Sequence, residues 1–373
     1  AMGGAYTAIA NDENAIWTNP AGIARVRKAR SRKTFHVIRA PQIVVGANAE
    51  GRGFLEAFQG SQEKSVEEVV SSTANIGDQP FWARSGLVLP QLLFDFERGV
   101  PMGFALFSNT KAKALITKAN PEQTQIEAVS DVGAVLTYAW TNRTNRFNIG
   151  LQIRPTYRYA YEESQLPSEL LTQKKELQDR IQGLANKSQG VGVDFGMMYT
   201  IADFWFPTVG LSVLNLPTGC RENYLNPFSE KRETVCGNKF TGSFGNDDAL
   251  STVDPTDIRL GLSITPRFGR KTALRFGFDM HHLAVTDGTN SYGLQQIEVQ
   301  KLLHGGVELF FGNPLVVSPF SLRAGYGQGF ISLGGKLIVS ILTLEFASYG
   351  QDVSTSSSSQ EDRRYLVSIG ADF

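Results

Sequence analysis

Hydrophobic and polar residues alternate along most of this chain, and the alternation repeats every two residues. A period of two is typical of β-strands, whose successive side chains point to opposite faces. Alternating runs that end at turn residues predict fourteen strands. They lie near residues 34–47, 83–96, 101–117, 126–140, 146–160, 190–202, 206–215, 256–267, 272–283, 304–312, 317–327, 329–338, 340–350 and 363–373.

The two faces of the predicted strands differ in chemical character. Near 146–160 one face is apolar and aromatic, with Phe147, Ile149, Leu151, Ile153, Tyr157 and Tyr159. The opposite face is polar and charged, and similar faces recur later in the chain. Burying such charges in a dry core costs roughly several kcal/mol each, whereas a wet lumen solvates them. The pattern predicts a membrane barrel that is apolar outside and polar inside; the alternative is a soluble sandwich with charged faces toward water.

The connections between these runs alternate in length. Short ones follow the even-numbered strands, at residues 97–100, 141–145, 203–205, 268–271, 313–316 and 339. Longer ones follow the odd-numbered strands, at 48–82, 118–125, 161–189, 216–255, 284–303 and 351–362, and only residue 328 breaks the rule. A membrane barrel typically has short turns at one end and long loops at the other. We therefore expect an all-β fold, a fourteen-stranded antiparallel transmembrane β-barrel.

Composition excludes some classes of protein. Lys and Arg together number 36, as do Asp and Glu, so no net charge attracts nucleic acid. Charged residues make up 19% of the chain, and no apolar run is long enough for a transmembrane helix. The first residues lack a basic and apolar leader, so we expect a secretion signal to have been removed or to precede this sequence.

The two cysteines, Cys220 and Cys236, lie in the polar, turn-rich stretch 216–255. Two Cys without a neighbouring pair of His do not complete a zinc site. A disulfide would stabilise this long loop by about 3 kcal/mol and would suit an oxidising compartment; two unpaired thiols are the alternative. We expect no metal and no cofactor.

Residues 1–33 do not alternate, and a barrel of this size leaves a lumen that something must fill. After several small residues come Trp17 and then Asn19-Pro20-Ala21-Gly22, where Pro fixes the backbone and Gly permits a reversal. Together with Met2-Gly3-Gly4-Ala5, Asn11-Asp12, the strand count and the terminal Phe373, this segment resembles the FadL-like outer-membrane transporters. The resemblance implies an N-terminal hatch over residues 1–33 that plugs a barrel of residues 34–373.

The resemblance also implies a function. A FadL-like barrel in the bacterial outer membrane passes hydrophobic small molecules, such as long-chain fatty acids, inward by diffusion. The hatch gates this passage, and Trp17 and Asn19-Pro20-Ala21-Gly22 would help to form it. The ligand would leave sideways into the membrane beside an irregular strand. Pro90 is a candidate for the irregularity because Pro cannot donate to the ladder; a harmless bulge is the alternative.

The partners expected on this basis are a hydrophobic small molecule or lipid, membrane lipids and lipopolysaccharide, and no nucleic acid. Two other functions fit a barrel of fourteen strands. A PorV-like adaptor in protein secretion would bind cargo or a translocon, and a structural or adhesive surface barrel would keep its plug closed. An apolar pocket between hatch and wall would favour transport, whereas a lateral opening filled by a protein would favour the adaptor.

Five arginines are expected to face the lumen: Arg154, Arg158, Arg259, Arg275 and Arg323. One interpretation is that they hold the carboxylate of a ligand, because guanidinium pairs with carboxylate through two hydrogen bonds. The other is that they brace the barrel by pairing with Asp194, Asp279, Glu308 and Glu345.

The long loops contain two helix candidates. Leu170, Leu177, Ile181 and Leu184 are spaced as on one face of an amphipathic helix over 168–187. This helix either forms a surface groove for a ligand with the loop 216–255 or covers the barrel mouth. A shorter candidate spans 63–70. The basic run from Arg25 to Lys33 is interpreted as a solvated link between hatch and barrel.

The sequence does not indicate an enzyme. Asp279, His281 and His282 form the one compact cluster of acid and imidazole groups, and alternation sends the two His side chains to opposite faces of a regular strand. No glycine-rich phosphate loop opens a helix, and no nucleophile elbow follows a strand. No catalytic residue is assigned.

Overall fold

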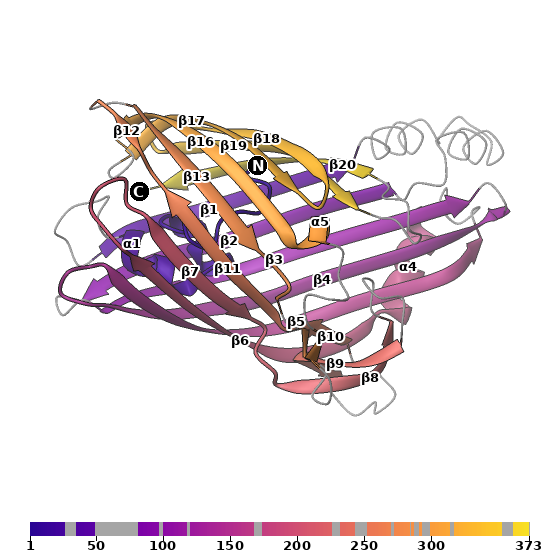
Figure 1. The fold of residues 1–373 in the computed structure, drawn as a ribbon. Coiled ribbons are helices and arrows are strands. Elements are labelled where there is room, and N and C mark those ends of the chain that lie inside the picture. Colours follow the sequence, from indigo (N-terminus) through magenta and orange to yellow (C-terminus); the bar gives the residue numbers. More distant parts are fainter. Residues whose placement is uncertain are drawn as a thin grey trace.

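A computed structural model of the chain describes residues 1–26, 35–48, 81–96, 100–117, 120–167, 174–225, 232–242, 252–269, 272–283, 285–286, 291–292, 299–313, 317–352 and 361–372. Fourteen antiparallel strands follow one another around a closed barrel (Figure 1). The barrel closes because β1 (Phe35–Asn48) pairs with β2 (Phe81–Phe96) on one side and with β20 (Glu361–Asp372) on the other.

The remaining wall strands pair in chain order between β2 and β20. They are β3 (Val100–Thr117), β4 (Asn120–Thr141), β5 (Phe147–Pro167), β6 (Asn186–Thr200), β7 (Thr208–Leu214), β11 (Asp257–Ile264), β13 (Thr272–Met280), β16 (Leu303–Asn313), β17 (Val317–Gly327), β18 (Phe330–Val339) and β19 (Leu342–Asp352). Each predicted run corresponds to one of these strands. The fourteen-stranded antiparallel barrel predicted from the alternation is therefore confirmed.

The alternation of faces matches the prediction as well. Leu151 and Ile153 on β5 point outward and are exposed. Gln152 lies between them and is buried in the lumen, as is Asp194 on β6. In β20, Tyr365, Val367 and Ile369 face outward; Phe373 lies outside the described residues. An exposed apolar exterior around a polar interior is the arrangement that a lipid environment requires.

Strands β4 and β5 are longer than the alternation predicted, whereas their long neighbour β3 has the predicted bounds to within one residue. The connection expected at 118–125 is reduced to residues 118–119, because β4 already begins at Asn120. These strands have 18, 22 and 21 residues, whereas about 9–11 are enough to cross a bilayer. Polar residues and Pro121 near the tip of β4 interrupt the alternation and hide the extension from sequence analysis. One side of the barrel therefore rises beyond the membrane at the long-loop end.

Helix α4 (Lys174–Leu184) covers the outer face of these extensions. Leu177 and Ile181 pack against an apolar cluster formed by Ala114, Ile126, Tyr161 and Leu166. The predicted helix exists, but it begins at Lys174, and Leu170 lies outside the described residues. Its apolar side packs on the barrel's own strands, because the extensions carry an apolar outer face above the lipid. The contacts of this side therefore do not support a groove shared with the loop 216–255.

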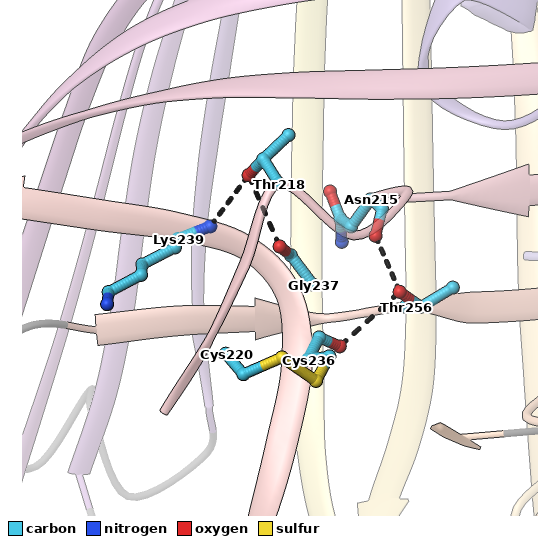
Figure 2. The surroundings of a disulfide bond; sticks show 7 residues. All are labelled: Asn215, Thr218, Cys220, Cys236, Gly237, Lys239 and Thr256. Atoms are coloured by element: carbon cyan, nitrogen blue, oxygen red, sulfur yellow. Dashed lines mark hydrogen bonds between the residues drawn. A yellow bond between two sulfur atoms is a disulfide. The ribbon is translucent and has the colours of Figure 1, made fainter. Parts of the chain in front are cut away.

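The loop 216–255 contains a small sheet of β8 (Gly219–Leu225), β9 (Arg232–Gly242) and β10 (Thr252–Pro255). Cys220 and Cys236 lie opposite each other on β8 and β9 and are joined by a disulfide (Figure 2). Beside it, the Thr256 hydroxyl donates to the carbonyls of Asn215 and Cys236 at 2.7 and 3.4 Å. The sheet is also anchored to the wall, because β9 pairs with β6 at Ser188 and Gln189.

The other elements are short. They are β12 (Arg267–Phe268), the hairpin β14 (Val285–Thr286) and β15 (Ser291–Tyr292), α5 (Val299–Leu302), and the N-terminal turns η1 (Glu13–Trp17), η2 (Pro20–Gly22) and α1 (Ile23–Val26). Among the described residues, no helix has the length and apolar character needed to cross a membrane. The helix predicted over 63–70, and most of the basic run that follows Arg25, lie outside the described residues.

The packing of α4 makes a testable prediction. We expect Ile181→Asp to weaken the attachment of α4 by about 2 kcal/mol, because a carboxylate would face the apolar cluster without a partner. Leu184→Asp is the matched control, since Leu184 is 57% exposed. Hydrogen exchange over residues 174–184 would measure the difference. Equal protection in the two variants would contradict the packing described here.

Candidate functional site

The N-terminal segment, defined here as residues 1–26, lies against the inner face of the barrel wall (Figure 1). Two of its three short helical turns, η1 and η2, are capped by side chains from the segment itself. The Asp12 carboxylate accepts from the Asn14 N–H at 2.9 Å, and the Asn19 side chain accepts from the Ala21 N–H at 3.1 Å. Such caps satisfy N–H groups that a short helix leaves unpaired. Many backbone polar groups of the segment are therefore hydrogen-bonded within the segment itself.

Asn19 fixes the segment to the wall. Its side-chain amide is fully buried and donates to the carbonyls of Thr7 at 2.8 Å and Leu211 at 3.3 Å. The wall strands contain glycine where the Asn19–Pro20 backbone approaches. A Cβ on Gly196 would lie 2.1 Å from Asn19 Oδ1, and one on Gly150 would lie 2.3 Å from the Pro20 carbonyl carbon. The Asn-Pro-Ala-Gly segment therefore occupies a notch that only glycine leaves open.

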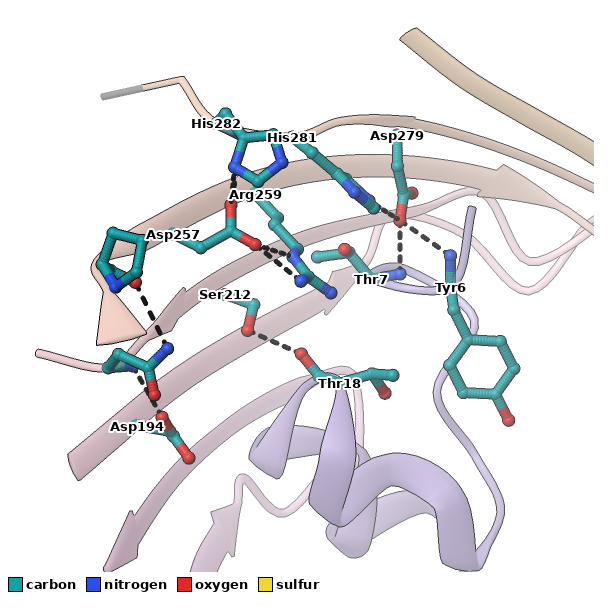
Figure 3. A network of polar contacts seen from close by, with 12 residues as sticks. Tyr6, Thr7, Thr18, Asp194, Ser212, Asp257, Arg259, Asp279, His281 and His282 are labelled. Carbon is teal, nitrogen blue, oxygen red and sulfur yellow. Dashed lines mark hydrogen bonds and ion pairs between the residues drawn. The ribbon is translucent and has the colours of Figure 1, made fainter. Parts of the chain in front are cut away.

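Further contacts hold the segment, and Figure 3 shows those made by Asp279 and Ser212. The Asp279 carboxylate on β13 accepts from the N–H groups of Tyr6 and Thr7, each at 2.7 Å. Ser212 on β7 donates its hydroxyl to the Thr18 carbonyl at 2.7 Å. Arg25 donates to the hydroxyl of Thr200 on β6. Asp279 was expected to pair with a lumenal arginine, but it instead binds backbone N–H groups of the N-terminal segment.

All five predicted lumenal arginines contact carboxylates. Arg158 is the most extensively paired: its guanidinium donates to both oxygens of Asp131 at 2.7 and 2.9 Å and to both oxygens of Asp254 at 2.8 and 2.9 Å. Its guanidinium carbon also lies 3.8 Å from the centre of the Phe240 ring. Because Asp131 belongs to the wall and Asp254 to β10, Arg158 ties the small outer sheet to the barrel.

The other four arginines are paired in the same way. Arg154 contacts Asp194 at 3.3 Å, and Arg259 contacts Asp257 at 2.6 Å. Glu308 receives both Arg275 at 3.3 Å and Arg323 at 2.7 Å. These contacts favour the bracing interpretation over a role in holding the carboxylate of a ligand. Paired charges that are largely buried hold lumenal side chains in place beside the apolar cluster between the N-terminal segment and the wall.

A cavity of about 580 Å³ lies between the N-terminal segment, the wall and the small outer sheet. Its lining includes Trp17 and Tyr6 from the segment, and Phe107 on β3 meets the Trp17 ring edge-on at 5.4 Å. Further apolar lining comes from Val44, Val88 and Leu366, and Phe240 lines it from β9. Burial raises the pKa of the Tyr6 phenol well above its ordinary value, so this lining residue stays neutral. The volume suits a small organic ligand.

Arg84 is a lining residue that sequence analysis missed. Its Nε donates to the Asn109 side-chain oxygen at 2.8 Å, and no carboxylate among the described residues pairs with it. The strand register places Lys111 directly opposite Arg84. Neighbouring like charges on facing strands are destabilising. Alternation along β2 could have placed Arg84 on the lumenal face, but the irregularity at Pro90 obscures which residues of β2 face inward.

The wall is irregular near Pro90. The register between β2 and β3 shifts between Leu89 and Gln91. A second shift, between β1 and β20, falls between Arg39 and Gln42 and so includes Pro41. Between β1 and β2 the pairing resumes at Arg39↔Gln91 and Gln42↔Val88, which puts the two prolines in the same interrupted region. Prolines supply no N–H to a ladder, so this is a weakly paired part of the wall.

His281 and His282 do not form a close pair, in agreement with the prediction. They follow the end of β13, and their ring centres are 6.2 Å apart. His281 instead stacks on His304 of β16, with ring centres 3.9 Å apart. Long-range pairing of β13 with β16 brings them together, which alternation alone does not reveal. In the described part of the chain, no group of three or more His, Cys, Asp or Glu is arranged to hold a metal ion.

No protein-family model matches the sequence, and no curated protein matches it. Solved structures do match. A TodX monoaromatic hydrocarbon channel mutant, deltaS2, aligns with a TM-score of 0.54 and 11% identity over 100% of this chain and 96% of that chain. The TodX deltaS2S3 mutant gives a TM-score of 0.52 and 11% identity over 96% and 94%. The barrel has the fold of the FadL-family channels.

At this identity the likeness shows the FadL-family fold alone. The toluene transporter TbuX of Ralstonia pickettii also aligns, with a TM-score of 0.49 and 10% identity over 100% of this chain and 97% of that chain. The two TodX proteins are monoaromatic hydrocarbon channels.

The notch in the wall gives a second prediction. Gly196→Ala places a Cβ where Asn19 Oδ1 now lies, so we expect it to loosen the N-terminal segment by about 1–3 kcal/mol. Gly86→Ala is the control, because its Cβ would meet its nearest neighbour, Val44, at 3.6 Å. Hydrogen exchange over residues 1–26 would measure the loss. A segment equally protected in both variants would show that the notch does not anchor it.

Proposed function

We propose that this chain is an outer-membrane channel that passes hydrophobic small molecules, such as long-chain fatty acids, by passive diffusion. The single observation that carries the proposal is the cavity of about 580 Å³ between the N-terminal segment and the barrel wall. A solid barrel with an adhesive or structural role has no need of such a space. The fold shared with the TodX channels supports this interpretation.

In this proposal residues 1–33 act as the hatch and residues 34–373 as the barrel. Asn19-Pro20-Ala21-Gly22 holds the hatch in its notch, while Trp17 forms part of the passage. The hatch is attached by hydrogen bonds and close backbone contacts to several strands, with Asp279, Ser212 and Asn19 as the main links. Because each link is a separate polar contact, the segment can shift without disturbing the strand ladder.

The proposed exit is lateral, through the interrupted region around Pro41 and Pro90. Gln42 and Val88, which flank this region, also line the cavity. A ligand in the cavity is therefore next to a part of the wall where the ladder pairing is interrupted. Leaving there places an apolar molecule directly in the lipid, which is more favourable than release into water.

Arg84 is proposed to bind the polar end of an anionic ligand. It lines the cavity without a carboxylate partner among the described residues, and Lys111 stands opposite it. A carboxylate placed beside Arg84 would form a charge-assisted hydrogen bond and relieve the repulsion between the two cations. Val88, Phe107 and Leu366 would contact the apolar part.

The test is uptake into proteoliposomes with two probes, a fluorescent long-chain fatty acid and toluene. We expect Val88→Trp to reduce uptake of both probes at least tenfold, because the indole would fill the cavity. Leu136→Trp is its matched control, since Leu136 on β4 is 47% exposed on the outer face and lies away from the proposed exit. Equal uptake by these two variants would contradict a route through the cavity.

Arg84→Gln tests the site for the anionic end of the ligand. We expect binding of the fatty acid to weaken about tenfold, which corresponds to the loss of one charge-assisted hydrogen bond of about 1.4 kcal/mol, while toluene binding stays unchanged. Arg84→Lys should retain most of the affinity. If the purified barrel binds neither probe and a protein co-purifies in equal amount, the secretion-adaptor function replaces the channel.

A further inference from the structure

The stacked pair of His281 and His304 contacts the start of the N-terminal segment. Both rings are buried, with 7% and 6% of their surface exposed. His304 Nδ1 lies 2.5 Å from the Gly3 carbonyl oxygen. A carbonyl can only accept, so Nδ1 carries the proton and Nε2 of His304 is the unprotonated nitrogen. That Nε2 is buried and has no hydrogen-bond partner.

The segment turns sharply at this contact. Gly4 has φ +97°, and a Cβ on it would lie 2.7 Å from His304 Nδ1 and 3.3 Å from His281 Cε1. Two residues later, the N–H groups of Tyr6 and Thr7 bind Asp279. The two rings and the Asp279 carboxylate therefore hold residues 3–7 from one side. Because these contacts leave no room for an added atom, the attachment of residues 3–7 depends on the protonation state of the two rings.

The charged groups around the pair come from each neighbouring element. Asp279 Oδ2 on β13 lies 3.6 Å from His281 Nε2, which itself has no hydrogen-bond partner. On β11, Asp257 is already engaged by Arg259 at 2.6 Å and by His282 at 3.2 Å. Tyr6, from the segment, stays neutral near physiological pH. Asp279 is thus the one carboxylate near the pair that is not already bound to a cation, among the described residues.

We propose that His281 and His304 form an acid-sensitive clasp that releases the start of the N-terminal segment from the wall as the pH falls. A proton on His304 Nε2 has no acceptor and lies against the neighbouring ring. A proton on His281 Nε2 attracts Asp279 Oδ2, the same oxygen that accepts from Tyr6 and Thr7. Two charged rings at 3.9 Å also repel each other. Each protonation step therefore weakens a contact with the segment.

The direction of the effect follows from linkage. In the released state the imidazoles meet water and take up protons near pH 6.5, as free histidines do. In the closed state burial disfavours the charged form of both rings, and only His281 has a carboxylate, Asp279, near an added proton. The released state therefore binds more protons, and its population rises as the pH drops below about 6.5. The rise is at most about tenfold per pH unit for each imidazole. The clasp is closed at neutral and higher pH.

Met2 is a built-in reporter of release, because it is 5% exposed and lies beside the clasp. The experiment is hydroxyl-radical footprinting of the barrel in nanodiscs between pH 7.5 and pH 5.0. We expect oxidation of Met2 to increase at least tenfold over this range. Met198, fully buried on the wall strand β6, is the internal control and should stay protected. Oxidation of Met2 that does not change with pH would overturn the proposal in the unaltered protein.

Two variants assign the effect to the clasp. His281→Phe keeps an aromatic ring in the stack but cannot be protonated, so we expect a shallower pH dependence of Met2 oxidation. His282→Gln removes the neighbouring imidazole, which binds Asp257 and not the segment, and should leave the dependence unchanged. The opposite result, a flat profile only in His282→Gln, would also overturn the clasp.

The link to transport rests on the proposed function, and it is tested by a separate measurement, the uptake of toluene. If Met2 becomes accessible in acid and proteoliposome uptake of toluene rises with it, the clasp regulates the channel. If Met2 becomes accessible and uptake does not change, the clasp stands and the gating role of the hatch fails. Toluene is the probe because it carries no charge that would itself change with pH.

Discussion

The whole structure depends on pairing every backbone N–H and C=O group in the membrane. Lipid offers these groups no hydrogen bonds, so the strands must close into a ring in which β1 meets β20. A ring of fourteen strands is too wide for its own side chains to fill. The interior is therefore filled in part by the N-terminal segment. Its stability comes from paired charges such as Arg158 with Asp131 and Asp254, and from an apolar cluster between the segment and the wall that includes Ile16, Ile23 and Val135.

The N-terminal segment fills part of the space that the wall side chains leave inside the wide ring. It brings irregular backbone into the lumen, where each unpaired polar group is costly. Asn19, Asp279 and Ser212 supply the missing partners, and glycines in the wall let the backbone come close enough to use them. The same polar contacts that make the segment tolerable inside the barrel are individually weak. Its attachment is therefore easier to change than the wall.

Much of the fold follows from local sequence, and much of the site does not. Alternation fixes which side of each strand meets lipid, so all fourteen strands and the lumenal position of residues such as Gln152 could be predicted. The long extensions of β4 and β5 could not, because Pro121 and polar residues at their tips break the pattern. The pairing of His281 with His304 depends on which strands become neighbours, and the Arg84 cavity depends on how the segment packs. Neither leaves a periodic signal.

The polar residues of the lumen are of two kinds, those whose charge or hydrogen-bonding atom has a partner within the described chain and those without one. The five predicted arginines have carboxylate partners and serve the wall, whereas Arg84 and Lys111 stand side by side at a cost of up to about 1 kcal/mol. The buried Nε2 atoms of His281 and His304 carry a comparable cost. Where chain contacts balance a charge or a lone pair, the group is structural. Where they do not, the group can respond to a species from outside the chain: in our proposals, an anion that binds at Arg84 and, in acid, a proton that opens the histidine clasp.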